Sequence, residues 1–312
     1  MTLLWRDGVY QPTESAEVGS VAGVEMTWDA ARPACVRCVI SSDYRSEAPL
    51  MFRHEVTEAV ARAEVAIQIE VAAGVSAAIV DSYQGADGVA YTHQVAWDVQ
   101  LGKGAVLHYY KLQDEGDLAI HASQFTAEQG SESQLFTYHV MTGAVRTQEQ
   151  LTYVLSGERA TCRALGFYDG QGEQHTAVSS HVTHAADHTE SAQQFKGVAR
   201  AACDLRFQGN IEVPAGRRGI VATQQNHYLS LSPRAKATAQ PELTIDADDV
   251  SCAHGATIGQ LDEDSLFYLR SRGIPEAEAR ALLVRAFYAD LFDSFAHPQI
   301  AADCLARCYA DE

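Results

Sequence analysis

Cationic residues are scarce in this sequence of 312 residues. Its 23 Lys and Arg stand against 41 Asp and Glu, which gives a formal net charge of −18. Nucleic acids and anionic membranes both require a basic face on a partner protein, so this deficit argues against either as a ligand. Apolar runs are also short, and none approaches the roughly 18 residues of a membrane span.

A secretory signal is also missing, because no basic stretch followed by a sustained apolar core opens the chain. Cysteines are few: residues 35, 38, 162, 203, 252, 304 and 308. An odd, scattered set in a long chain indicates reduced thiols rather than a disulfide framework. We therefore expect a cytoplasmic protein. Cys35 and Cys38 have the spacing of a redox or metal-binding pair, but no second pair accompanies them.

Motifs for ATP binding and nucleophilic catalysis are absent from the sequence. The Gly102-Lys103-Gly104 segment does not fit the spacing of a phosphate-binding loop. We find no serine nucleophile elbow and no paired-carboxylate signature. The chain is therefore not expected to be an enzyme, and any ATP hydrolysis linked to its function would belong to another chain.

Short β-strands dominate the pattern from about residue 35 to 252. Apolar and polar residues alternate over 64–71 and again over 91–99, which is the period of a half-buried strand. Further candidate strands are 76–83, 104–110, 133–140, 149–155, 160–168, 175–183, 195–206, 208–213, 218–222, 227–231 and 242–252. The one helix candidate in this region lies near 54–62. A sandwich, a barrel or a solenoid would fit, and no clean sequence repeat chooses among them.

Helices are expected to follow from residue 262. Asp262 is a suitable N-cap, with Glu263 and Asp264 in the first turn, and Gly273 suits the position after the last turn. Pro275 then opens a second helix at its first position. The expected apolar stripe of that helix is Leu283, Phe287, Leu291 and Phe295, broadened by Leu282 and Ala286, and a final helix is expected over 299–309 after Pro298.

The most informative segment is 241–273, PELTIDADDVSCAHGATIGQLDEDSLFYLRSRG. Cys252 and His254 lie two residues apart in an expected strand, so both side chains project from one face. A thiolate and an imidazole together suit iron, copper or zinc. The run ADDVSCAHGATIG followed by LDEDSLFYLRSRGI resembles the C-terminal signature of the SufB/SufD family, scaffold subunits of the SUF system of iron–sulfur cluster assembly, in its SufD-type form.

The resemblance extends upstream in weaker form and covers roughly 60–296. Segments 184–191, 195–198, 207–211 and 224–232 are similar to the family core in order and spacing. It implies a mainly β fold, a right-handed parallel β-helix over 36–260 with a C-terminal helical domain over 261–312. Residues 1–35 are left as an extension of uncertain structure. The helical domain that precedes the core in many SufD-type chains is not expected here.

The resemblance also implies a non-catalytic scaffold that pairs with a SufB-like subunit, a homodimer being the other possible assembly. His254, a tentative metal ligand, and Cys252 would lie where the cluster forms. The isolated chain would hold no cofactor, and iron or a cluster would be transient in the complex. Gly255 replaces a glutamate of SufB-type chains, and 228–232 has no thiol, so this chain would not assemble a cluster alone.

The SufC ATPase of the SUF system would dock on the C-terminal helices. The exposed face expected to receive it includes Asp264, Arg270, Arg272 and Arg280.

A different class of function rests on His175, His181, His184 and His188. These histidines would be the ligands of a β-helix or cupin-like metalloenzyme. His184 and His188 would face together only on a helix, whereas this stretch reads as strand and turn. The metalloenzyme hypothesis predicts tight metal binding by the isolated chain and turnover of a small substrate or polysaccharide.

Overall fold

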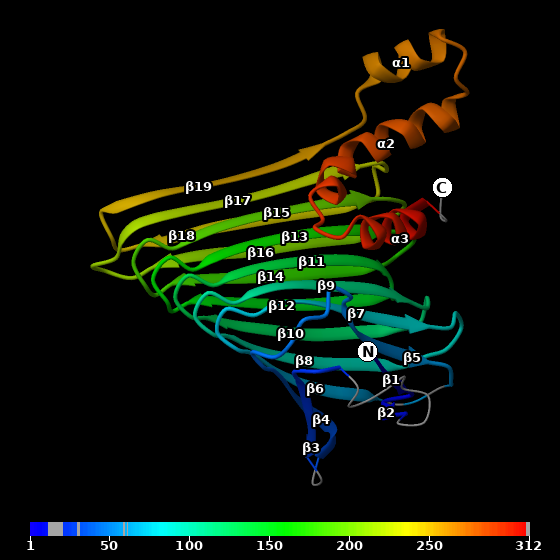
Figure 1. Ribbon diagram of the computed structural model, residues 1–312. Helices are drawn as coiled ribbons and strands as arrows, with labels where there is room; N and C mark the ends of the chain where they lie inside the picture. The colour runs from blue at the N-terminus through cyan, green and yellow to red at the C-terminus, as the bar shows by residue number, and fades with distance from the viewer. Residues whose placement is uncertain (12–20, 30–31, 59, 61, 310–312) are drawn as a thin grey trace.

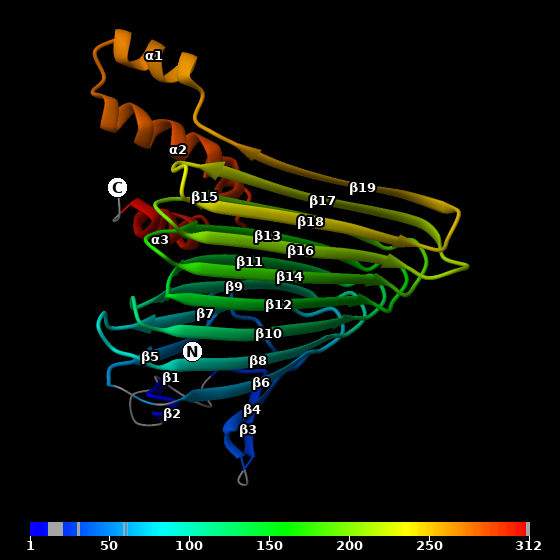
Figure 2. The same cartoon turned by 180° about the vertical axis from the view of Figure 1, so that it is seen from behind.

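The chain folds into a solenoid of parallel strands that alternate between two facing sheets. The computed structural model describes residues 1–11, 21–29, 32–58, 60 and 62–309. Ten strands form the first sheet, in the order β19-β17-β15-β13-β11-β9-β7-β5-β1-β2, and nine form the second, in the order β18-β16-β14-β12-β10-β8-β6-β4-β3. Figures 1 and 2 show the two sheets from opposite sides, with the helices at one end of the strands. The predicted β-helix is therefore confirmed.

Most strands are ten residues long and pair in register with the strand of the next coil. The first sheet comprises β1 (Thr2–Arg6), β2 (Val9–Tyr10), β5 (Leu50–Val56), β7 (Ser76–Gly85), β9 (Val106–Glu115), β11 (Gln134–Gly143), β13 (Thr161–Gly170), β15 (Glu190–Ala199), β17 (Arg218–Ser230) and β19 (Asp249–Gly259). The second comprises β3 (Val24–Asp29), β4 (Arg32–Ile40), β6 (Ala63–Val71), β8 (Thr92–Leu101), β10 (Ile120–Gln129), β12 (Arg146–Leu155), β14 (His175–His184), β16 (Asp204–Val213) and β18 (Lys236–Ile245).

Several expected boundaries are wrong. The helix candidate at 54–62 begins inside β5, where His54 and Val56 are buried and Glu55 between them is not, as a strand requires. The candidate 195–206 crosses the turn between β15 and β16, and 242–252 crosses the turn between β18 and β19. Candidates 218–222 and 227–231 are two parts of β17. Strand β10 was missed altogether.

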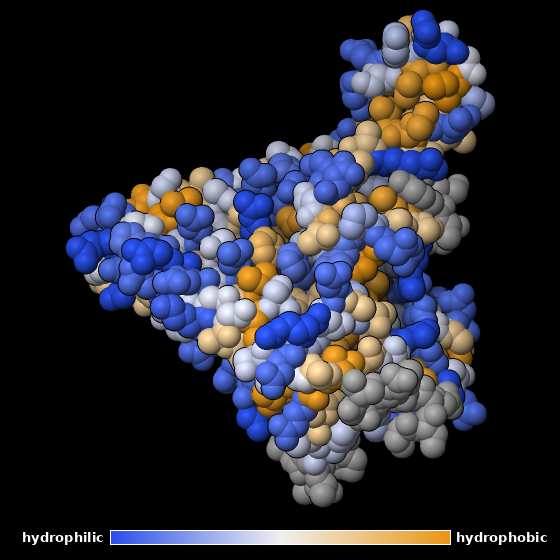
Figure 3. Space-filling model, viewed as in Figure 1, coloured by the Kyte–Doolittle hydropathy of each residue, from blue (hydrophilic) through white to orange (hydrophobic). Residues whose placement is uncertain are grey.

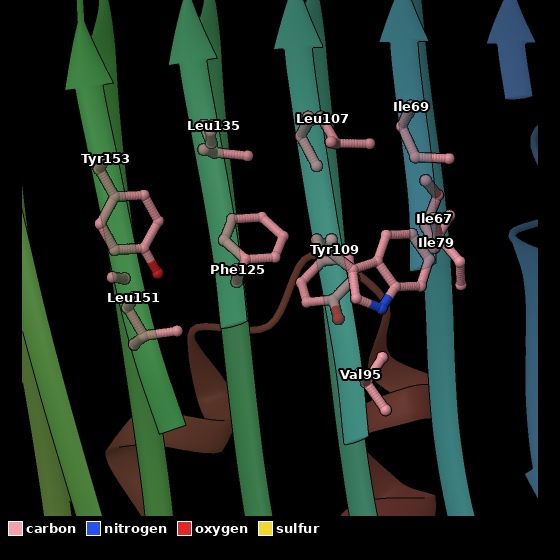
Figure 4. Packing of buried hydrophobic residues seen from close by; sticks show 14 of the residues in the cluster. Ile67, Ile69, Ile79, Val95, Leu107, Tyr109, Phe125, Leu135, Leu151 and Tyr153 are labelled. Atoms are coloured by element: carbon pink, nitrogen blue, oxygen red, sulfur yellow. The ribbon is translucent and has the colours of Figure 1, made fainter. Parts of the chain in front are cut away.

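The apolar core lies between the two sheets, where inward side chains of successive coils stack. Figure 4 shows this packing around Ile67, Leu107, Phe125 and Tyr153, all nearly or fully buried. Period-two alternation sends one set of residues inward. The other set faces solvent in most of the second sheet, whereas part of it is buried under the helices on the first sheet. All seven cysteines are free thiols, as expected. Cys35 and Cys38 lie three residues apart on β4, so their side chains point to opposite faces.

Three helices follow the last strand: α1 (Glu263–Ser271), α2 (Glu276–Asp293) and α3 (Pro298–Tyr309). The Asp262 carboxylate accepts a hydrogen bond from the Ser265 backbone N–H at 3.1 Å, which confirms the predicted N-cap. Gly273 follows α1 with a φ of 89°, a conformation that favours glycine. Pro275 is the N-cap of α2 rather than its first helical residue. None of the helices in the described residues is long and apolar enough to cross a membrane.

The buried stripe of α2 agrees with the predicted one only in part. Leu291 and Phe295 are buried as predicted, whereas Leu283 and Phe287 are only half-buried and Leu282 is exposed. The other large buried residues of α2 are Val284, Tyr288 and Phe292. These residues pack with α3 against the outer face of the first sheet, where Phe167 and Tyr288 place their ring centroids 4.7 Å apart. The prediction holds only in part because α2 contacts α1, α3 and the first sheet, so its buried face is not a single i+4 row.

Charge also holds α2 to the solenoid. The Lys196 ammonium on β15 donates to the Phe287 carbonyl oxygen at 2.7 Å and to the Asp290 carboxylate at 2.5 Å. In contrast, α1 packs on α2 and projects away from the sheets (Figure 1). Thr2–Arg6 of the predicted N-terminal extension pair with β5, so this part of it continues the first sheet.

Candidate functional site

The last coil of the solenoid leaves two strand edges open. Among the described residues, β19 pairs only with β17 and β18 pairs only with β16. At the opposite end, the antiparallel strands β2 and β3 cover the outer edges of β1 and β4. An uncovered edge presents backbone N–H and C=O groups that can pair with a strand of another chain. The C-terminal end therefore presents two long strand edges of parallel sheets, whereas at the opposite end the sheets finish in the shorter strands β2 and β3.

The interior is also incompletely covered at this end. Ile211, Val213, Ile220 and Ala222 of the preceding coil are between 0% and 1% exposed. The inward residues of the last coil that pack on them remain half-exposed: Leu243, Ile245, Ala247, Val250 and Cys252. Apolar side chains that complete one coil thus have no further coil to cover them.

Cys252 and His254 lie on β19 at this open end. In register, Cys252 is opposite Ala222 of β17 and His254 is opposite Gln224. Cys252 is half-buried, and burial raises the pKa of its thiol, which keeps it protonated in the free chain. His254 is exposed, and within the described residues its side chain makes no hydrogen bond or ion pair. An unengaged imidazole beside a thiol is available to a ligand or a partner.

Buried amides lie directly behind His254. Gln224 is fully buried, and among the described residues neither its side-chain oxygen nor its side-chain nitrogen has a hydrogen-bond partner. Asn226 Oδ1 on the same strand and Gln193 Nε2 on β15 are also unpaired. Each unsatisfied buried polar group costs about 1–3 kcal/mol, so such groups are few in native proteins and need an explanation. Sequence reasoning missed these amides. Period-two alternation along β17 would have placed Gln224 and Asn226 on the inward face.

The residues predicted to receive the ATPase lie exposed on α1, on α2 and between them. Asp264, Arg270, Arg272 and Arg280 all have exposed side chains. Arg270 and Arg280 both approach Glu276, at 3.5 and 3.2 Å. Exposed ion pairs of this kind contribute little energy.

Aromatic residues of α1, which sequence reasoning did not single out, are more conspicuous than these charges. Phe267 is 72% exposed and Tyr268 is 61% exposed. Leu282 on α2 is exposed as well. Figure 3 shows an apolar patch on the projecting part of the molecule that α1 forms. Phe267, Tyr268 and Leu282 are called the α1 patch below.

The histidines of the alternative hypothesis are not brought together. His175 and His181 lie on the outward face of β14, and His181 pairs with Glu212 at 3.0 Å. His184 points inward and is fully buried, with Thr189 and Ser191 hydroxyls at 2.8 and 2.9 Å from its ring nitrogens. Burial lowers the pKa of His184 to about 4, so it is a neutral core residue. His188 lies in the turn that follows.

Comparison with known proteins gives a consistent result. Residues 54–287 match the family described as SUF system FeS cluster assembly, SufBD core domain. An iron–sulfur cluster assembly SufBD family protein from Synechocystis is 34% identical over 65% of this chain and 45% of its own length. The iron–sulfur cluster assembly protein SufD of Escherichia coli is 25% identical over 84% of this chain and 63% of its own length.

A chloroplast protein of Arabidopsis thaliana, ABCI7, is 31% identical over 71% of this chain and 47% of its own length. The chain thus spans about half the length of the curated relatives it matches. The family match alone covers most of the solenoid and reaches into α2. On this evidence the chain belongs to the SufBD core family of the SUF system, as a SufD-type member.

Proposed function

We propose that this chain is a non-catalytic scaffold subunit of iron–sulfur cluster assembly that pairs with a SufB-like subunit through β18 and β19. The observation that carries the proposal is the pair of open edges in the last coil, with an unengaged His254 on one of them. Strand addition would satisfy the backbone groups of these edges and cover the half-exposed inward residues. Family membership supplies the class of process.

In this proposal, His254 and Cys252 contribute donors to iron or to the nascent cluster, which is the cargo of the complex. A thiolate and an imidazole suit iron, but two donors on one strand are too few to hold a cluster. The partner subunit would supply the others. Since the Cys252 thiol is protonated in the free chain, iron binding there would release a proton.

Recruitment of a SufC-type ATPase is assigned to the α1 patch rather than to charges alone. Exposed aromatic residues are frequent anchors of protein interfaces, and a charged rim mainly sets orientation and association rate. Phe267 and Tyr268 would be the anchors, with Asp264, Arg270, Arg272 and Arg280 around them. The charged residues predicted from the sequence thus keep a role at the rim.

Replacing His254 with Ala tests the assignment of the site. The variant should fold and melt as the wild type does, because the side chain is exposed and unbonded. After anaerobic reconstitution with a SufB-type and a SufC-type chain, the iron and sulfide content of the complex should fall sharply. Cys252→Ala should give a smaller or equal defect.

His181→Ala is the matched control, since His181 is a half-exposed histidine on the outward face of β14. It should leave the cluster yield unchanged. A normal iron content in the His254 variant would contradict the assigned role of this residue.

A further inference from the structure

A cluster of titratable side chains is enclosed in the solenoid, away from the open end and from the α1 patch. Its members come from β5 and β7–β12 and are each between 0% and 3% exposed: His54, Asp81, His93, Lys111, Glu115, His121, His139 and Glu149. Such groups are costly to bury unless they are paired. The proposed scaffold function uses none of them.

The charges of this cluster do not balance. The Lys111 ammonium contacts the Glu149 carboxylate and the Ser123 hydroxyl, so these opposite charges compensate each other. Asp81 accepts hydrogen bonds from the Tyr83 and Tyr109 hydroxyls, both at 2.6 Å. Within the described residues, neither Asp81 nor Glu115 has a lysine or arginine partner, so two buried carboxylates lack a fixed countercharge.

Glu115 lies between two histidines from the other sheet. His93 Nδ1 is 3.0 Å from Glu115 Oε1, and His121 Nδ1 is 2.6 Å from Glu115 Oε2. One potential ligand atom from each of the three residues lies within 4.8 Å of those of the other two. In the part of the chain that the structure describes, both ring nitrogens of His121 lack an aligned hydrogen bond although the side chain is fully buried. A single central cation would engage all three groups.

We propose that His93, Glu115 and His121 bind a divalent transition metal ion of the Zn²⁺ or Fe²⁺ type. Two imidazoles and one carboxylate are a common protein ligand set for these ions, whereas Ca²⁺ and Mg²⁺ prefer oxygen ligands alone. One divalent ion also carries the charge needed to balance Glu115 and Asp81. Gln113 Nε2, 3.4 Å from Glu115 Oε2, would orient the ligating carboxylate.

The position of the site indicates a structural role. His93 and His121 belong to β8 and β10 of the second sheet, and Glu115 ends β9 of the first, so the ion would join the two sheets across the interior. All three ligands are buried, so the ion would enter while the chain folds and leave only when it opens. The proposal is independent of the cluster-assembly function, which uses residues at the open end of the solenoid.

Zinc retention by the full chain tests the proposal. The chain, carrying Cys252→Ala and His254→Ala to remove the donors of the open end, is refolded with Zn²⁺, passed through gel filtration and dialysed against EDTA. We expect one zinc ion per chain to survive dialysis and to be released on unfolding. The melting temperature should rise relative to metal-free protein, because the ion binds only the folded state.

Adding Glu115→Gln or His121→Gln should abolish the retained zinc. Glu115→Gln should still fold, since it removes a buried charge and keeps the shape of the side chain. His181→Ala removes a half-exposed histidine that pairs with Glu212 and should retain the zinc. Zinc retained by Glu115→Gln, or zinc that EDTA removes from every variant, would overturn the proposal.

A measurement without substitutions in the site guards against misfolded variants. Crystals of the wild-type chain refolded with Zn²⁺ should show an anomalous scattering peak between His93, Glu115 and His121. Zinc peaks at surface residues alone would overturn the proposal.

Discussion

Ala256→Lys is expected to abolish pairing with a SufB-like subunit while the free chain remains folded. Residue 256 continues the inward alternation of Cys252 and His254, and it is exposed because no coil lies beyond it. In the free chain a lysine can extend into water there. In the pair, its ammonium would be buried without a counterion, which costs several kcal/mol. Since about 1.4 kcal/mol corresponds to a tenfold change, the affinity should fall at least about a hundredfold. Sedimentation of the Ala256→Lys chain mixed with the purified SufB-like subunit measures this loss of affinity.

Ala253→Lys is the matched control. It places the same charge on the same strand but on the opposite, outward face, where Ala253 is exposed. Pairing should change little. Equal affinity for wild-type and Ala256→Lys chains would contradict the role of the open end, and so would equal losses in the two lysine variants.

Replacing both Phe267 and Tyr268 with Ala should eliminate binding of the SufC-type ATPase. These side chains are 72% and 61% exposed, so their loss should leave the thermal stability of the chain nearly unchanged. At an interface, anchors of this type commonly contribute about 2 kcal/mol or more each. Calorimetric titration of the ATPase into each variant gives the affinities, and circular dichroism confirms the fold.

The pair Arg270→Ala and Arg280→Ala separates aromatic anchoring from charge. Both guanidinium groups are exposed and approach Glu276, so their removal should reduce the affinity only modestly. A larger loss from the arginine variant than from the aromatic variant would restore the charged face as the main contact. An unchanged affinity in the aromatic variant would remove the α1 patch from the interface.

Alternation of apolar residues predicted the strands whose inward side chains are apolar, such as β6. It missed β10, because His121, Ser123 and Gln129 point inward there among the few apolar residues. The inward polar residues that prevented the prediction of β10 include His121, a proposed metal ligand. Its partners His93 and Glu115 lie on other strands, so only the register of the coils brings the three together.

No sequence repeat is visible in the solenoid, because residues that stack at equivalent positions of successive coils differ in type. Along one inward column, Leu135, Cys162, Ser191, Ala222 and Cys252 follow one another from coil to coil. Any small or apolar side chain can occupy such a position, so the coils repeat in the structure and not in the sequence.

The candidate site was partly predictable. Period two placed Cys252 and His254 on one face, and the segment 241–273 indicated the family. That β19 and β18 end their sheets was not visible in the sequence, since it depends on how all preceding strands pair.

Hydrogen–deuterium exchange of the wild-type chain, free and bound to a SufB-type subunit, tests most directly whether β19 is the contact strand. In the free chain, the backbone amides of Asp249–Gly259 that face the open edge should exchange rapidly, because no strand accepts their hydrogen bonds. In the complex, these amides and those of β18 should become strongly protected. Strands β1 and β2 at the opposite end of the solenoid should not change. Unaltered exchange over β19, with protection only elsewhere on the chain, would contradict the proposed pairing.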